Sequence, residues 1–161
     1  MQIDESTFWK LIESLELVVY EDITEADLEP ICNALAEMSV EDIGKFEEIL
    51  TEKLYALDSR AHAIAGIDPR LPSLPDGSEF ISSDGFLYQR CYVVANGKQF
   101  YEEVLANPSK MPKGIQYEFE SLLYVANGAY QQKTGEEDMP QTSELSYETG
   151  SNKKGWEESL V

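Results

Sequence analysis

The sequence predicts an all-α protein: a single compact domain of about six helices with Pro- and Gly-rich loops, followed by a loosely ordered C-terminal tail. Apolar residues recur at the three- and four-residue spacing of amphipathic helices, while prolines and glycines gather between those runs. The 161 residues are enough for one domain with a core of its own. We therefore divide the chain into a helical domain, residues 1–140, and a polar tail, residues 141–161.

Two helices are predicted in the N-terminal part of the chain. The first has an apolar face at helical spacing, formed by Phe8, Leu11, Ile12 and Leu15. Ser6 or Thr7 can serve as its N-cap. A second helix is expected after Thr24, with acidic residues in its first turn. Pro30 would remove a hydrogen bond inside this helix, so we expect either a kink at Pro30 or a first turn that starts later.

The third predicted helix is the longest and runs from Ser39 to Gly66. Ser39 and Asp42 form a near capping box at its start, and Gly66 suits the position just after a helix end. Its apolar face is sustained over several turns by Ile43, Phe46, Ile49, Leu50, Leu54 and Leu57. This continuous pattern predicts one uninterrupted helix.

Three more helices are predicted, at residues 83–96, 98–106 and 117–135. Residues 67–80, with three prolines and a glycine, cannot form regular structure and are expected to be an ordered loop. The loop retains apolar residues that can pack against the domain: Ile67, Leu71, Leu74 and Phe80. In the polar tail, Trp156 is the candidate anchor to the domain.

The net charge of −19 is distributed unevenly. Residues 1–64 hold 16 acids and 4 bases, residues 65–135 hold 8 and 6, and residues 136–161 hold 7 and 2. Such a surplus disfavours direct binding of nucleic acid, whose phosphates need clustered Lys and Arg, and disfavours anionic membranes. It predicts an acidic face over the N-terminal helices and favours fast, salt-sensitive association with a basic protein partner. The alternative is that the charge only solvates the surface.

Several other classes find no support in the residue pattern. The N-terminus has acids where a signal peptide needs lysines, and no apolar run could span a bilayer, so the expected location is cytoplasmic. Cys32 and Cys91 lie among apolar residues and imply no disulfide framework. With one histidine, no Cys pair, no Asp-rich calcium loop and no Gly-rich phosphate loop, neither a metal nor a cofactor is expected.

Three stretches resemble the motifs of a bacterial family of small helical domains of unknown function. They are "FWKLI" at residues 8–12, the stretch at 82–108 and "LLYVANGAY" at 122–130, and the resemblance extends over residues 6–140. In the middle stretch the family pattern is matched by Ser82, Ser83, Asp84, Gly85, Phe86, Arg90, Gly97, Phe100, Leu105 and Pro108.

The resemblance implies an all-helical domain and no established activity. The chain departs from the family pattern at Ser83, where the family has an aspartate, and at Tyr92-Val93-Val94, where it has Trp-Leu-Ile. A family site that used those groups would be incomplete in this chain.

The residues from Ser82 to Arg90 allow two interpretations. In the structural one, Ser82 or Ser83 caps a helix, Asp84 complements the helix dipole and Arg90 binds a carboxylate. In the functional one, Asp84 and Arg90 face a cleft in which the guanidinium holds a small anion. His62, the only group with an ordinary pKa near neutrality, could join that cleft, although a histidine satisfied within a helix end is the simpler interpretation.

The function predicted from these features is that of an acidic protein-binding module docking a basic partner. An immunity or inhibitor protein that masks a cationic toxin would fit this description. Glu47, Glu48 and Glu52 are the candidate docking residues. The alternative is an enzyme or small-anion binder that uses a cleft with Asp84 and Arg90, but no residue is assigned a catalytic role.

Overall fold

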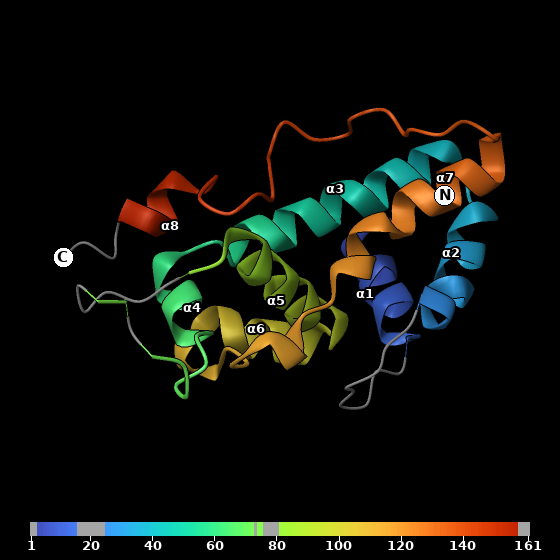
Figure 1. Ribbon diagram of the computed structural model, residues 1–161. Coiled ribbons are helices and arrows are strands. Elements are labelled where there is room, and N and C mark those ends of the chain that lie inside the picture. The colour runs from blue at the N-terminus through green and yellow to red at the C-terminus, as the bar shows by residue number, and fades with distance from the viewer. Residues whose placement is uncertain (1–2, 16–24, 73, 76–80, 158–161) are drawn as a thin grey trace.

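The protein is built from helices alone in the part of the chain that its computed structural model describes, which is residues 3–15, 25–72, 74–75 and 81–157 (Figure 1). This confirms the all-α prediction, with more elements than the six expected. The α-helices of these ranges are α1 (Glu5–Glu13), α2 (Glu29–Ala36), α3 (Val40–Ala56), α4 (Arg60–Ala65), α5 (Ser83–Ala95), α6 (Lys98–Ala106), α7 (Val125–Thr134) and α8 (Lys153–Glu157). Four 3₁₀ helices connect them: η1 (Glu25–Leu28), η2 (Pro108–Lys110), η3 (Ile115–Tyr117) and η4 (Glu120–Tyr124).

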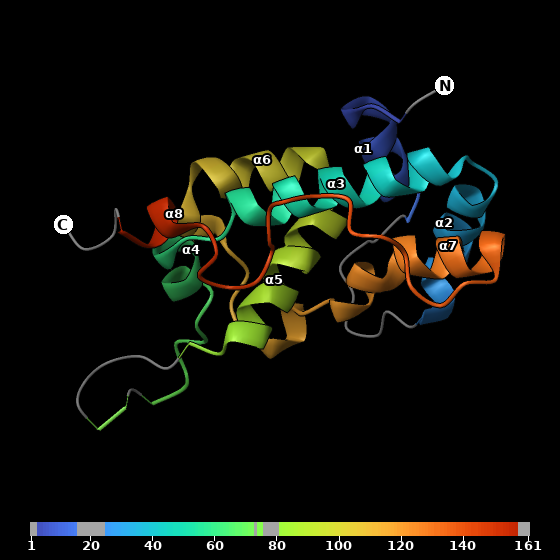
Figure 2. The same cartoon turned by 90° about the horizontal axis from the view of Figure 1, so that it is seen from above.

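Helix α3 is the axis of the fold. Helices α1, α2, α5 and α7 all pack against it, and its apolar face is buried as the sequence predicts. The segment that follows α7 lies alongside α3 in Figure 1 and again in the view from above in Figure 2, before it reaches α8. We call residues 136–152 of this segment the strap. None of the described helices is both long and apolar enough to cross a bilayer.

The N-terminus is held by two aspartates. The Asp4 carboxylate accepts a hydrogen bond from the Thr7 amide at 2.8 Å, so Asp4 is the N-cap of α1 and the prediction of Ser6 or Thr7 is wrong. Asp42 accepts hydrogen bonds from the Ile3 amide at 2.8 Å and from the Ser39 hydroxyl at 2.9 Å. The capping pair of Ser39 and Asp42 is thereby confirmed, and Asp42 also ties the chain start to α3.

Pro30 lies in the first turn of α2, after a single 3₁₀ turn, so the α-helix does start later and no kink is needed. A proline is tolerated there because the first amides of a helix have no partner inside it. The predicted starting point, Thr24, lies outside the described residues.

The expectation of one helix from Ser39 to Gly66 is wrong. Helix α3 ends at Ala56, and a new helix, α4, begins at Arg60 with Ser59 as its N-cap; the Ser59 hydroxyl accepts a hydrogen bond from the amide three residues later at 3.1 Å. A serine that can cap a helix competes with the helical backbone, which favours a break. The apolar pattern continues across the break because Leu57 stays buried, so periodicity alone could not reveal it.

Helices α5 and α6 confirm the predictions for residues 83–96 and 98–106. The last predicted helix, residues 117–135, is α-helical only in α7. Its first part is diverted because the Phe119 amide donates a hydrogen bond to the Tyr88 carbonyl of α5 at 2.9 Å, which no sequence periodicity encodes.

The described leucines of the loop of residues 67–80 do not pack down as expected. Leu71 is 62% exposed and Leu74 is 41% exposed. Phe80, the last of its apolar residues, lies outside the described residues.

The buried amide of Gln89 joins α5 to two segments that meet beside it, the end of α4 and the loop of residues 112–114. Its Nε2 donates to the Gly66 carbonyl at 2.8 Å and, more weakly, to the Pro112 and Gly114 carbonyls, both at 3.4 Å. Because Gln89 is only 7% exposed, water cannot easily replace these bonds.

We expect Gln89→Leu to lower the free energy of unfolding by about 1–3 kcal/mol, because buried carbonyls lose their donor while the apolar volume is kept. Urea denaturation measures the change. Gln99→Leu on the exposed face of α6 is the matched control and should stay within about 0.5 kcal/mol of the wild type. Equal losses in the two variants would contradict the role of the Gln89 amide.

Candidate functional site

Arg90 is completely buried and does not face a cleft that could take an anion. Its Nη1 donates to the Leu54 carbonyl at 2.9 Å, its Nη2 donates to the Thr149 hydroxyl at 3.0 Å, and its guanidinium carbon lies 4.6 Å from the centre of the Phe86 ring. No described carboxylate forms an ion pair with it, so the expected carboxylate partner is replaced by a carbonyl and a hydroxyl. Burial lowers the pKa of Arg90, and the charge of Asp58 partly offsets this.

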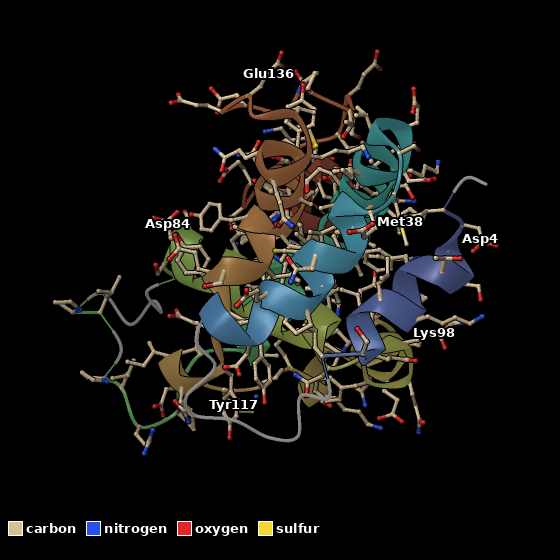
Figure 3. The ribbon with its side chains drawn as sticks, turned by 90° about the vertical axis from the view of Figure 1, so that its right-hand side faces the viewer. Asp4, Met38, Asp84, Lys98, Tyr117 and Glu136 are labelled. Carbon is tan, nitrogen blue, oxygen red and sulfur yellow. The ribbon has the colours of Figure 1, made fainter. Side chains whose placement is uncertain are left out.

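Asp84 lies in the first turn of α5, where Ser82 is the N-cap through a bond from the Gly85 amide at 3.1 Å. Its side chain is exposed, at one edge of the face shown in Figure 3. The interpretation of this stretch as a helix start is thus confirmed. The cleft beside it, of about 320 Å³, is lined by Ser82, Gly85 and Phe86 but not by Asp84 among its described residues.

His62 is satisfied on both sides of its ring. Its Nδ1 lies 2.6 Å from the Ser59 hydroxyl and its Nε2 lies 2.9 Å from the Val104 carbonyl. The carbonyl can only accept, so Nε2 carries the proton of this bond, and in a neutral ring Nδ1 accepts from the Ser59 hydroxyl. Burial lowers the pKa of His62, which favours this neutral form. Since Asp84, Arg90 and His62 each have separate surroundings, the structure does not bring them together as one site.

Arg90 instead helps to hold the strap on the domain. Asp58, which follows the end of α3, is the second residue of this contact. Asp58 is completely buried, and its carboxylate accepts hydrogen bonds from the Gly150 amide at 3.1 Å and the Asn152 amide at 3.0 Å. It also accepts one from the Trp156 indole at 2.8 Å. These bonds fix residues 150–156 on the domain.

Further contacts attach the end of the strap and α8 to the N-terminal half of α5. The Thr149 hydroxyl accepts from Arg90 and donates to the Ser83 carbonyl at 2.7 Å, and Trp156 packs edge-on against Phe86 at 6.3 Å. A Cβ on Gly155 would lie 2.5 Å from the Asp58 carbonyl oxygen, so only glycine fits there. The prediction of a loosely ordered tail is therefore wrong for these residues, although Trp156 is an anchor as expected.

Sequence reasoning missed Asp58, the residue on which this contact depends. It lies between two helical patterns and reads as one more acid of an acidic segment. Its only sequence signal is its position directly before Ser59, because an Asp-Ser pair inside a helical pattern favours a cap and a break.

Glu47 of α3 lines a cleft of about 360 Å³ between α3, α7 and the strap. Its Oε2 is buried without a hydrogen-bond partner among the described residues, and burial raises the pKa of Glu47 to about 7. Sequence reasoning expected Glu47 to be a solvated docking residue. In the structure its side chain is half-buried, with one oxygen fully shielded, and it lines a cleft.

Glu48 and Glu52 are on the outer side of α3, as expected of docking residues. Glu48 is paired with Lys45 at 3.3 Å, and Glu52 is exposed. The described His, Cys, Asp and Glu side chains include no group of three that could hold a metal ion.

The sequence profile of a family described as "Protein of unknown function (DUF4240)" matches residues 3–132. No curated protein and no solved structure matches the chain at a significant level. The family match includes Glu47, Asp58 and Arg90, whereas the strap that covers them lies beyond its end.

We expect Asp58→Ala to release residues 149–157, because the Gly150 and Asn152 amides and the Trp156 indole lose their charged acceptor. Hydrogen exchange of this segment should become at least about tenfold faster, and the free energy of unfolding should fall by about 3 kcal/mol. Asp138→Ala, which removes an exposed aspartate of the strap, is the control. Unchanged exchange in Asp58→Ala would show that apolar packing alone holds the segment.

The raised pKa of Glu47 predicts that the stability of the folded protein falls as the pH rises. The folded state holds this proton up to pH about 7, whereas the ordinary pKa is 4.5, so the contribution of Glu47 to stability is present below pH 4.5 and lost as the pH rises through 7. Glu47→Gln should therefore gain on the wild type between about pH 4.5 and pH 8, on the order of 2 kcal/mol. Denaturant unfolding at several pH values measures the difference. A constant difference would contradict the burial of this carboxyl.

Proposed function

The chain belongs to this family of unknown function, and we propose that it is an acidic protein-binding module that docks a basic partner. The observation that carries the proposal is an acidic stripe along the outer side of α3 and the start of α1. The stripe consists of the carboxylates of Asp4, Glu5, Glu41, Glu48 and Glu52.

The stripe is continuous because of helical spacing and one contact between helices. Glu41, Glu48 and Glu52 follow one another at seven and four residues, which places them on one side of α3. Asp42 holds the chain start against α3, which brings Asp4 and Glu5 next to that side.

Two of the lysines near the stripe are paired with its carboxylates or with the groups beside them. Lys45 pairs with Glu48 at 3.3 Å. Lys53 pairs with Glu5 at 2.6 Å and lies 5.9 Å from the Trp9 ring centre and 5.8 Å from that of Tyr101. Lys10, near Asp4, and Lys98, near Glu5, offset part of the negative charge at the α1 end. No described residue forms an ion pair with Glu41 or Glu52, so the negative field is strongest along α3.

A second group of acids extends the field at the end of the molecule where α7 and the start of α3 meet. Three exposed acids, Glu136, Glu137 and Asp138, follow α7, and Figure 3 shows Glu136 at the upper end of the molecule. Met139 and Pro140, which follow this group, line a shallow cleft together with Glu41, so the second group lies near the start of α3.

Exposed charges of this kind affect mainly how fast a partner associates and which partner is preferred. A cationic surface is steered to them over about 8–10 Å at physiological salt, and the gain falls as salt rises. A protein that masks a cationic protein, such as an inhibitor of a basic toxin, needs this property. The protein we propose is therefore an inhibitor of a basic protein, and the stripe is the face with which it docks.

Neutralising the stripe with Glu41→Gln, Glu48→Gln and Glu52→Gln together should slow association with a basic partner by about tenfold at low salt and remove most of its salt dependence. The first partners to test are the products of the genes next to its own, by co-purification and surface plasmon resonance at low and high salt.

The matched control removes the same charge elsewhere, with Glu102→Gln, Glu103→Gln and Glu157→Gln on α6 and α8. It should bind like the wild type apart from a small loss through net charge. If both triple variants bind equally, or if binding does not respond to salt, the stripe is not the docking face.

A further inference from the structure

The cleft that Glu47 lines is closed by the strap. Glu47 and Thr51 of α3 form one wall, Asn127 of α7 forms another, and residues 139–143 and 145–148 form the third. Its volume of about 360 Å³ lies within the range of small-ligand sites. Because the strap lies beyond the end of the family match, this cleft is a property of this chain and not of the family pattern alone.

Glu47 is the one carboxylate in this cleft with a buried oxygen that has no partner among the described residues. Folded proteins leave few buried polar atoms without a partner, because each costs about 1–3 kcal/mol, and more for a charged group. Nothing in α3 requires an acid here, since Glu47 does not form an ion pair with any described residue. The wall of the cleft therefore contains a carboxylate that no described group of the chain neutralises.

The surrounding groups favour a donor that carries positive charge. Glu148 also lines the cleft, so two carboxylates face the same space. Thr51, Gln141 and Tyr147 add hydroxyl and amide oxygens that can accept further N–H bonds. Burial raises the pKa of Tyr147 to about 12, with the Glu47 and Glu148 charges adding to the effect, so the phenol stays protonated and adds no charge. An ammonium or guanidinium group offers several N–H donors together with the charge that Glu47 lacks a partner for.

We propose that this cleft binds the ammonium or guanidinium group of an organic cation, with Glu47 as its counterion and the strap as its wall. The cation is either a free amine, such as a diamine, or a Lys or Arg side chain presented by another protein. The site does not depend on the docking proposed above, because the acidic stripe lies outside the cleft and contributes none of its lining residues.

Isothermal titration of the full chain with putrescine and agmatine tests the proposal, with 1,4-butanediol as the neutral analogue of putrescine. We expect saturable 1:1 binding of the amines, none of the diol, and at least about tenfold weaker amine binding in Glu47→Gln. Glu52→Gln, on the same helix but exposed, is the matched control and should bind like the wild type.

Proton release gives a second readout that a purely structural role would not change. A bound cation favours the ionised form of Glu47, whose pKa burial raises to about 7. Because the carboxyl is then about half protonated near pH 7, amine binding at this pH should release up to about half a proton. Titration in two buffers with different ionisation enthalpies measures it, and Glu47→Gln should abolish the release.

The amides of N-acetyl-lysine and N-acetyl-arginine distinguish the two sources of the cation. Binding as tight as that of the free amines supports a side chain of a partner, and tighter binding of the free amines supports a small-molecule ligand. Equal amine binding by wild type and Glu47→Gln, binding of the diol, binding of Ca²⁺ in place of the amines, or no saturable binding would each overturn the proposal. The triple stripe variant should keep amine binding, so a failure here is separate from a failure of the docking face.

Discussion

Two buried charges, Arg90 and Asp58, impose the constraint on which the rest of this structure depends. They do not form a direct ion pair, so each must be stabilised by other groups, since an unpartnered buried charge costs several kcal/mol. The strap supplies those groups: the Thr149 hydroxyl for the guanidinium, and the Gly150 and Asn152 amides for the carboxylate. The strap is therefore part of the folded domain. Its hydroxyl and amide groups make the hydrogen bonds to Arg90 and Asp58 that water would make if these side chains were exposed.

This constraint also sorts the acidic residues of α3 and its end by what they can do. The Asp58 carboxylate is hydrogen-bonded to the strap, and Glu47 lines a cleft that the strap covers. Glu48 and Glu52 remain at the surface. The surroundings of these carboxylates differ in how far they exclude water. This desolvation determines whether a carboxylate anchors a chain segment, has a shifted pKa or contributes to a long-range field. The net charge of −19 therefore overstates the charge that is available for docking a partner.

The local patterns predicted much of the fold because they depend on neighbours in the sequence. Residues 83–96 and 98–106 form helices with Ser82 as a cap, and Ser39 with Asp42 caps α3. The break after Ala56 was not predicted, because the apolar pattern runs on across it and its cause is a capping serine next to an acid that turns inward. For the candidate site, the patterns identified Glu47 but assigned it to the surface.

The sequence by itself determined the helical class, most helix positions and the acidic N-terminal half, because periodicity, capping and charge are local properties. Only the tertiary structure decided which acids are free and which are buried. The partners of Arg90 and Asp58 come from segments 36 to 98 residues away, and Glu47 lies in a cleft between such segments. A contact over that separation depends on how helices pack and where the strap lies, and no spacing in the sequence encodes it.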